Sequence, residues 1–157
     1  MKKKILTVFL SVLISSLSIA NDASELTWEM METLDYQEGI VPKALQDYDN
    51  RLVEVAGFIV PLELDDYIDT VKEFILVPNP LACMHIPPPG PNQMIFVTME
   101  TAIPLDMDDR GVSITGKLSI PEPIPGETLI SFELMGHSAV EADIDFEDPF
   151  DEILDLL

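Results

Sequence analysis

Apolar runs of β type, separated by short polar or proline-rich links, constrain the fold of this chain more than any other feature. Five such runs cover Arg51–Leu64, Glu73–Val77, Met94–Met99, Val112–Ile120 and Leu129–Met135. The fourth run alternates apolar and polar residues at every position, which is typical of a strand with one buried face. Five strands with short links predict a mainly β protein built as a small five-stranded OB-like barrel.

The first of these runs has apolar residues on both faces, which predicts a strand buried on both sides. Gly57 lies in its middle and indicates a bulge or a sharp bend, as a small closed barrel requires. Residues 43–50, just before this run, are polar and are expected to be a connection.

A short N-terminal helix is expected over Ser24–Leu34, capped by Thr27 or by Ser24. Its apolar face is expected to contain three residues that follow one another at intervals of four, namely Leu26, Met30 and Leu34.

The C-terminal segment, residues 141–157, differs from the rest in having eight acids and no base. Asp148 can cap a helix that has Pro149 at its first position, where proline is favoured. Apolar residues then recur at helical spacing, at Phe150, Ile153, Leu154 and Leu157. We therefore predict an acidic amphipathic helix that buries this stripe against its own barrel or against a partner.

Residues 1–20 have the pattern of a secretory signal peptide. Three lysines precede an apolar stretch, and Ser18 and Ala20 occupy the −3 and −1 positions of a cleavage site. An uncleaved membrane anchor is the alternative, but the stretch is shorter than the roughly 20 residues that a span needs. We expect a periplasmic mature chain from Asn21, with a single barrel-like domain over 21–140 and no stable membrane insertion after cleavage.

Charge and cysteine content exclude several classes of function. The 29 acids and eight bases give a formal net charge of −21, which argues against binding to nucleic acid or to anionic lipid. The single cysteine excludes an internal disulfide and any CxxC redox or zinc-ribbon motif. The hydrophobic fraction of 47% predicts a folded core rather than a disordered acidic chain.

The chemistry of the chain is concentrated in residues 78–93, PNPLACMHIPPPGPNQ, in which six of sixteen residues are proline. Cys83 and His85 are two apart, so in an extended segment their side chains point to the same side. Thiolate and imidazole together suit Zn²⁺ or copper far better than Ca²⁺ or Mg²⁺. The prolines lower the entropy cost of holding two ligands in place.

Two ligands are too few for zinc, which takes about four protein ligands, or three and a water. His137, at the end of the last predicted strand, is the third candidate ligand. Carboxylate candidates lie at Glu63, Asp65 and Asp66, and Met84 adds a thioether if the ion is Cu(I).

The motifs VAGFIVPLE (55–63), EFILVP (73–78) and ACMHIPPPGPNQ (82–93) resemble a bacterial family known as domain of unknown function 3299. The resemblance covers roughly residues 27–135. It implies small exported proteins, often lipoproteins, encoded near transporter-type permeases and periplasmic proteins linked to zinc supply. This chain departs from that pattern because it lacks a lipid-attachment cysteine at the cleavage site.

Four hypotheses remain open at this point. Cys83 and His85 are metal ligands, or they are ordinary buried residues, or the cysteine forms a nucleophile–base pair with a histidine. The fourth is a pure binding module that docks through the proline-rich loop and the acidic tail. We favour an exported, non-enzymatic accessory protein that handles a metal, zinc by preference, and whose partner is an envelope permease or a periplasmic metal carrier.

Overall fold

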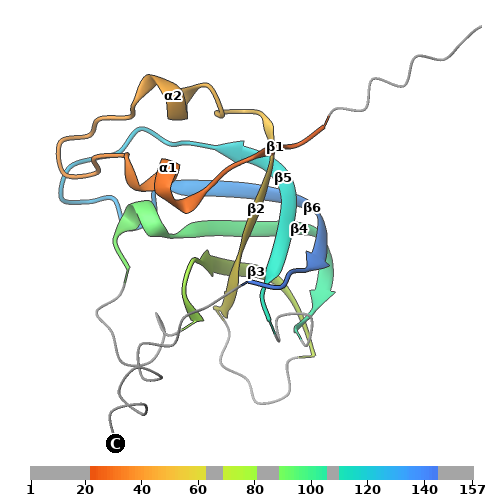
Figure 1. The fold of residues 1–157 in the computed structure, drawn as a ribbon. Coiled ribbons are helices and arrows are strands. Elements are labelled where there is room, and N and C mark those ends of the chain that lie inside the picture. Colours follow the sequence, from red (N-terminus) through yellow and green to blue (C-terminus); the bar gives the residue numbers. More distant parts are fainter. Residues whose placement is uncertain (1–21, 63–68, 81–88, 106–109, 145–157) are drawn as a thin grey trace, which may run out of the picture.

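The computed structural model describes residues 22–62, 69–80, 89–105 and 110–144 (Figure 1). Within these ranges the chain forms six strands, namely β1 (Ser24–Glu25), β2 (Leu52–Pro61), β3 (Thr70–Val77), β4 (Ile95–Pro104), β5 (Val112–Ser119) and β6 (Phe132–Glu141). The same ranges contain the helices α1 (Trp28–Glu32) and α2 (Lys43–Gln46) and the short 3₁₀ helix η2 (Pro91–Gln93).

Strands β2 to β6 close into a barrel. The order is β2-β3-β4-β6-β5, and β5 pairs back onto β2. Only the β4–β6 pairing within this ring is parallel. The two-residue β1 adds a parallel partner to β2 outside the ring. The predicted mainly β, five-stranded OB-like barrel is therefore confirmed.

Gly57 marks the place where β2 changes partners. Residues up to Gly57 pair with β5, and residues from Phe58 onward pair with β3. A Cβ atom at Gly57 would lie 2.7 Å from the carbonyl oxygen of Val77, a distance that side chains do not tolerate. Glycine thus allows the close approach that closes the barrel at this corner.

The barrel interior is filled by large apolar side chains from alternate strand positions. Phe74, Phe132 and Ile114 are each completely buried there. The N-terminal segment adds Met31 and Leu34 to the same core, and Leu45 of α2 joins it. Figure 1 shows α1, α2 and η2 gathered on the same side of the barrel.

The N-terminal helix is shorter than predicted. Residues Ser24–Glu25 are extended because they pair with β2, and the backbone N–H of Leu26 donates to Glu54. Thr27 caps α1, as one of the two predicted caps, by accepting from the backbone N–H of Met30. Met31, rather than the predicted Met30, is the buried residue within the helix.

Two further expectations are corrected by the strand and helix bounds. β4 and β6 extend past the predicted ends, Met99 and Met135, to Pro104 and Glu141. Most residues in these extensions are exposed, so the alternation of buried and exposed positions that marks the strands in the sequence is weak there. The expected polar connection over 43–50 contains α2.

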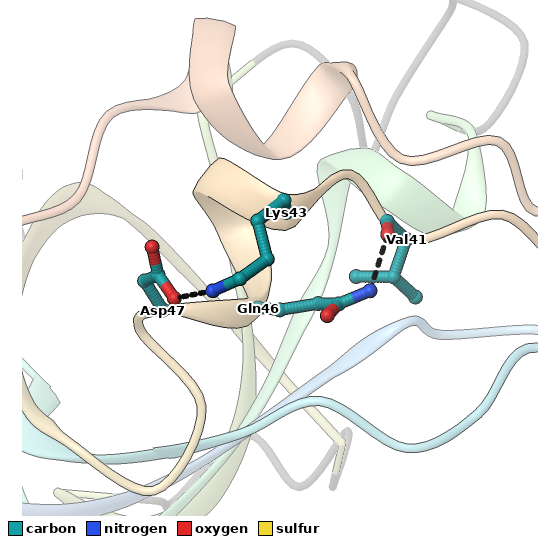
Figure 2. Close-up of polar contacts among 4 residues, drawn as sticks. All are labelled: Val41, Lys43, Gln46 and Asp47. Carbon is teal, nitrogen blue, oxygen red and sulfur yellow. Dashed lines mark hydrogen bonds and ion pairs between the residues drawn. The ribbon is translucent and has the colours of Figure 1, made fainter.

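The single turn of α2 is supported by local polar contacts (Figure 2). Lys43 and Asp47 form an ion pair four residues apart, and both side chains are mostly exposed. The side-chain amide of Gln46 donates to the carbonyl oxygen of Val41 at 2.7 Å. These contacts fix the direction of the chain as it leads into β2.

Several expectations lie outside the described residues. They are the signal peptide over 1–20, the carboxylates Glu63, Asp65 and Asp66, and the C-terminal helix with its stripe. Within the described ranges, no helix is both long enough and apolar enough for a membrane crossing.

Candidate functional site

The proline-rich loop is anchored at its described end, residues 89–93. The Asn92 side-chain amide donates to the carbonyl oxygens of Glu32 and Leu34, both at 3.0 Å. Glu32 is the last residue of α1 and Leu34 lies just past its C-cap, where carbonyl oxygens lack partners within the helix. The carbonyl oxygen of Pro91 accepts from the backbone N–H of Ser131, just before β6. The loop is thus tied to both the N-terminal segment and the barrel.

Gly90 is packed closely at this anchor. A Cβ atom there would lie 3.0 Å from Oδ1 of Asn92 and 3.4 Å from the hydroxyl of Tyr36. The sequence motif PGPNQ therefore has a structural role at its C-terminal end, where it holds the loop against α1.

Two of the three predicted ligands, Cys83 and His85, fall in residues 81–88, as does Met84, and lie outside the described residues. The structure therefore places only His137 of the predicted set. Among the parts of the chain that it does describe, no group of three or more His, Cys, Asp or Glu side chains is arranged to hold a metal ion.

His137 lies within β6, not at the end of the strand as predicted. It occupies a β-bulge, because Gly136 pairs with Gly116 and Ser138 pairs with Thr115, which leaves His137 between the two pairs. Bulges re-aim side chains and are common beside functional sites. The His137 side chain is 42% exposed on the outside of the barrel.

A carboxylate orients the His137 ring. Nδ1 of His137 lies 2.8 Å from Oε1 of Glu100, on the neighbouring strand β4. When the proton of the neutral ring is on Nδ1, Nδ1 donates a hydrogen bond to this carboxylate. Nε2 then keeps its lone pair and can coordinate a metal ion. Metal-binding histidines usually have such a carboxylate on the second ring nitrogen. Sequence reasoning missed Glu100, which only the pairing of β4 with β6 brings to this position.

His137 is distant from the strand end at which the loop joins β4. β4 begins at Ile95, which pairs with Phe132, and Met99 pairs with Gly136. Glu100 and His137 follow this last pair, so each lies five residues along its strand from the Ile95–Phe132 pair. At about 3.3 Å per residue this is about 16 Å. The described anchor of the loop and His137 therefore lie toward opposite ends of the β4–β6 pair.

A second surface of interest was not predicted as a site. Outward-facing side chains of β2, β3 and β4, with neighbouring loop residues, form a separate apolar cluster outside the barrel. We call it the outer apolar face; its members are Phe58, Val60, Ile75, Val77, Met94, Phe96, Ile130 and Ile144. The sequence predicted that β2 is buried on both sides, because both of its faces are apolar. In the structure, consecutive residues of β2 are buried only over Gly57–Ile59.

The groove beside α1 is acidic. It has a volume of about 420 Å³, and Trp28, Glu25 and Glu54 are among its lining residues. The indole N–H of Trp28 donates to Ala56 at 2.7 Å, and the Ser113 hydroxyl donates to Glu54 at 2.7 Å. At the start of α1, two hydrogen bonds to the Glu29 carboxylate lower its pKa. The larger effect comes from a backbone N–H and the smaller one from the Thr27 hydroxyl. Trp28, Glu54, Ser113 and Glu29 thus have partners within the fold, which gives these side chains of the groove a structural role.

The closed barrel, whose interior is filled by side chains, and the anchored end of its proline-rich loop define a small OB-like protein. The chain belongs to the family described as "Protein of unknown function (DUF3299)", whose model matches residues 15–138. This confirms the family resemblance drawn from the sequence motifs.

A solved structure of a DUF3299 family protein from Pseudomonas aeruginosa PAO1 has a similar fold. It has a TM-score of 0.59 and 21% sequence identity, and the match covers 80% of this chain and 99% of that one. A Leishmania major Friedlin protein assigned as an aspartyl-tRNA synthetase matches at 9% identity over 88% of this chain and 24% of its own; its TM-score of 0.39 carries no argument. No protein of curated function is significantly similar in sequence.

Proposed function

We propose that this protein is an exported, non-enzymatic accessory protein that handles a metal ion, zinc by ligand chemistry, for an envelope transport system. The observation that carries the proposal is the pair Cys83 and His85 in a loop stiffened by proline. A free thiol is unusual in an exported protein, and coordination to a metal would explain its persistence.

The geometry of His137 supports its place as a further ligand. Its contact with Glu100 matches the carboxylate–histidine arrangement of metal sites, and its bulge turns it outward. Its separation from the loop anchor means that a shared ion would require residues 81–88 to extend back along the barrel wall. If they do not, His137 and Glu100 would serve a separate, weaker contact with the metal or its carrier.

Zinc titration against a chromophoric chelator tests the ligands. We expect the unaltered protein to bind Zn²⁺ at micromolar concentration near neutral pH. The Co²⁺ form should show a thiolate charge-transfer band that Cys83→Ser abolishes. His85→Ala should weaken binding by about 10-fold or more, the scale for disturbing a metal-ligand environment. His137→Ala tests the third ligand.

Met84→Leu is the matched control in the same loop. It should leave Zn²⁺ affinity unchanged and weaken only Cu(I), which favours thioether ligands. A folded protein that binds no Zn²⁺ under these conditions would rule out metal handling. If Cys83→Ser loses more affinity for Cu(I) than for Zn²⁺, the metal handled would be copper rather than zinc, and the proposed metal-handling function would stand.

Export is the second part of the proposal, based on the signal-peptide pattern of residues 1–20. N-terminal sequencing of protein from the periplasmic fraction should begin at Asn21. Intact Met1, or recovery of the protein from the cytosol, would contradict it.

A protein-docking module without metal is the second candidate. The loop between β5 and β6 favours it, because Leu129 is 80% and Ile124 is 55% exposed. Such exposed apolar residues suit a partner surface, here an envelope permease or a periplasmic metal carrier. Calorimetry with such a partner in EDTA discriminates the two, because a pure docking module needs no metal to bind. Leu129→Ser should weaken this binding, whereas Glu122→Ser, an exposed polar control in the same loop, should not.

A further inference from the structure

The outer apolar face is too well buried for an ordinary outer wall of a barrel. Val77 is 2%, Phe58 7% and Ile75 8% exposed, although all three point away from the barrel interior. The strand positions that form the face carry no charge. Outward-facing side chains that are buried to this degree require further apolar chain to lie over the wall.

The described chain leads its own C-terminal end onto this face. After β6, the backbone N–H of Ala142 donates to Gly111 at 2.9 Å, and that of Ile144 donates to Arg110 at 3.1 Å. Arg110 also forms an ion pair with Asp143. These contacts turn the chain across the wall, and the Ile144 side chain packs into the outer apolar face.

Gly111 makes room for this turn. Its φ of +102° favours glycine, and a Cβ atom there would lie 2.4 Å from Cδ1 of Ile144. The turn and the contact of Ile144 with the face thus depend on one small residue. The path of the last described residues is therefore specified by the fold.

The segment that follows, residues 145–157, has the composition and length to continue the cover. Its apolar residues Phe150, Ile153, Leu154 and Leu157 recur at helical spacing, and three of its six acids, Asp151, Glu152 and Asp155, lie between them. As a helix, residues 150–157 would be about 12 Å long. Three adjacent strands at about 4.8 Å spacing present a face of similar width.

We propose that the outer apolar face is the docking surface for residues 145–157 of the same chain. The apolar stripe lies on the uncharged face, and the acidic residues of the segment point to solvent. Covering of the face by the chain's own tail would keep it from associating with other apolar surfaces. The proposal does not depend on metal binding.

The test uses the full-length protein and a synthetic peptide of residues 145–157. In the double variant Ile153→Asp and Leu154→Asp the chain's own tail is expected to leave the face. The peptide should then bind this variant one to one, and should bind the unaltered protein at least 10-fold more weakly because the face is already covered. The variant Glu152→Ala and Asp155→Ala, altered on the polar side of the tail, should behave like the unaltered protein.

The binding site is located by a second pair of substitutions made in the double variant. Phe96→Lys should abolish peptide binding, whereas Thr98→Lys, two residues further along the same strand outside the cluster, should leave it unchanged. Equal peptide binding by the unaltered protein and the double variant would overturn the proposal. So would failure of the folded double variant to bind the peptide, or an unaltered protein that is a dimer and becomes monomeric in the double variant, which would assign the tail to a second copy.

Discussion

The two halves of the outer barrel wall differ in kind, although the same strands form the interior. Over β5 and β6 most outward positions are polar, as at Thr115, Lys117 and Glu133, although Met135 and Val140 of β6 are exposed apolar residues. Where β2 and β3 pair with each other and with the start of β4, the outward positions are apolar, and Phe58, Ile75 and Val77 are buried. The end of β4, with Glu100, lies beside β6 and belongs to the polar half. The first half is a surface in contact with water, and the second is a surface that something covers.

This difference separates two kinds of function on one fold. The polar half can hold exposed, oriented groups such as His137 beside Glu100 without cost to folding. The apolar half contributes to stability through burial and is suited to a docked segment. Substitutions that measure stability on each half, and at the corner between them, test whether the division is real.

The interior sets the scale for these measurements. Phe132→Ala removes a completely buried ring from the barrel and should lower the free energy of unfolding by about 3–5 kcal/mol. Urea unfolding followed by circular dichroism measures this change. Leu129→Ala, three residues earlier and 80% exposed, should change it by less than about 0.5 kcal/mol. Similar losses at the two positions would show that the barrel is not packed as described.

The corner between the two halves should be the next most sensitive position. Gly57→Ala places a Cβ atom against the backbone carbonyl of Val77, which cannot move aside as a flexible side chain would. We expect a loss of about 1–3 kcal/mol in urea unfolding. Ala56→Ser at the neighbouring exposed position is the control and should be nearly neutral. A neutral Gly57→Ala would mean that β2 does not change partners at this point.

A direct comparison of the halves comes from two substitutions to alanine. Val77→Ala on the apolar half removes two buried methyl groups and should cost about 1–2 kcal/mol. Thr115→Ala on the polar half should cost less than about 0.5 kcal/mol. Thermal melts of both variants measure the difference. If Val77→Ala proves as mild as Thr115→Ala, the outer apolar face is not covered in solution.

Local pattern was enough to locate the five strands of the barrel, though not all of their ends, because alternation along each run reports which positions face the core. The full alternation of residues 112–120 correctly predicted β5, and Gly57 correctly indicated the bend that closes the barrel. The N-terminal helix was predicted too long because helical spacing does not reveal that Ser24 and Glu25 pair with β2. That pairing joins residues about thirty positions apart.

The candidate site was less predictable for the same reason. His137 was identified by its residue type, but Glu100 reaches it only through the parallel pairing of β4 with β6, 37 positions away in sequence. The bulge at His137 also depends on the register of β6 with β5. The contacts of Asn92 with the carbonyl oxygens of Glu32 and Leu34 likewise join residues about sixty positions apart.

The smallest expected change in stability is at Glu100, and it separates structure from function on the polar half. Glu100→Gln removes the charge of an exposed contact with His137 and should alter the free energy of unfolding by less than about 0.5 kcal/mol. If His137 is a zinc ligand, the same substitution should weaken Zn²⁺ binding by about 10-fold. The neutral amide would neither orient the ring as the carboxylate does nor raise the basicity of the imidazole. Glu133→Gln, on the outer side of β6 four residues before His137, is the control and should change neither quantity. Loss of zinc affinity without loss of stability would assign a binding role to the polar half, whereas unchanged affinity in both variants would remove His137 from the ligand set and leave Cys83 and His85 to be tested alone.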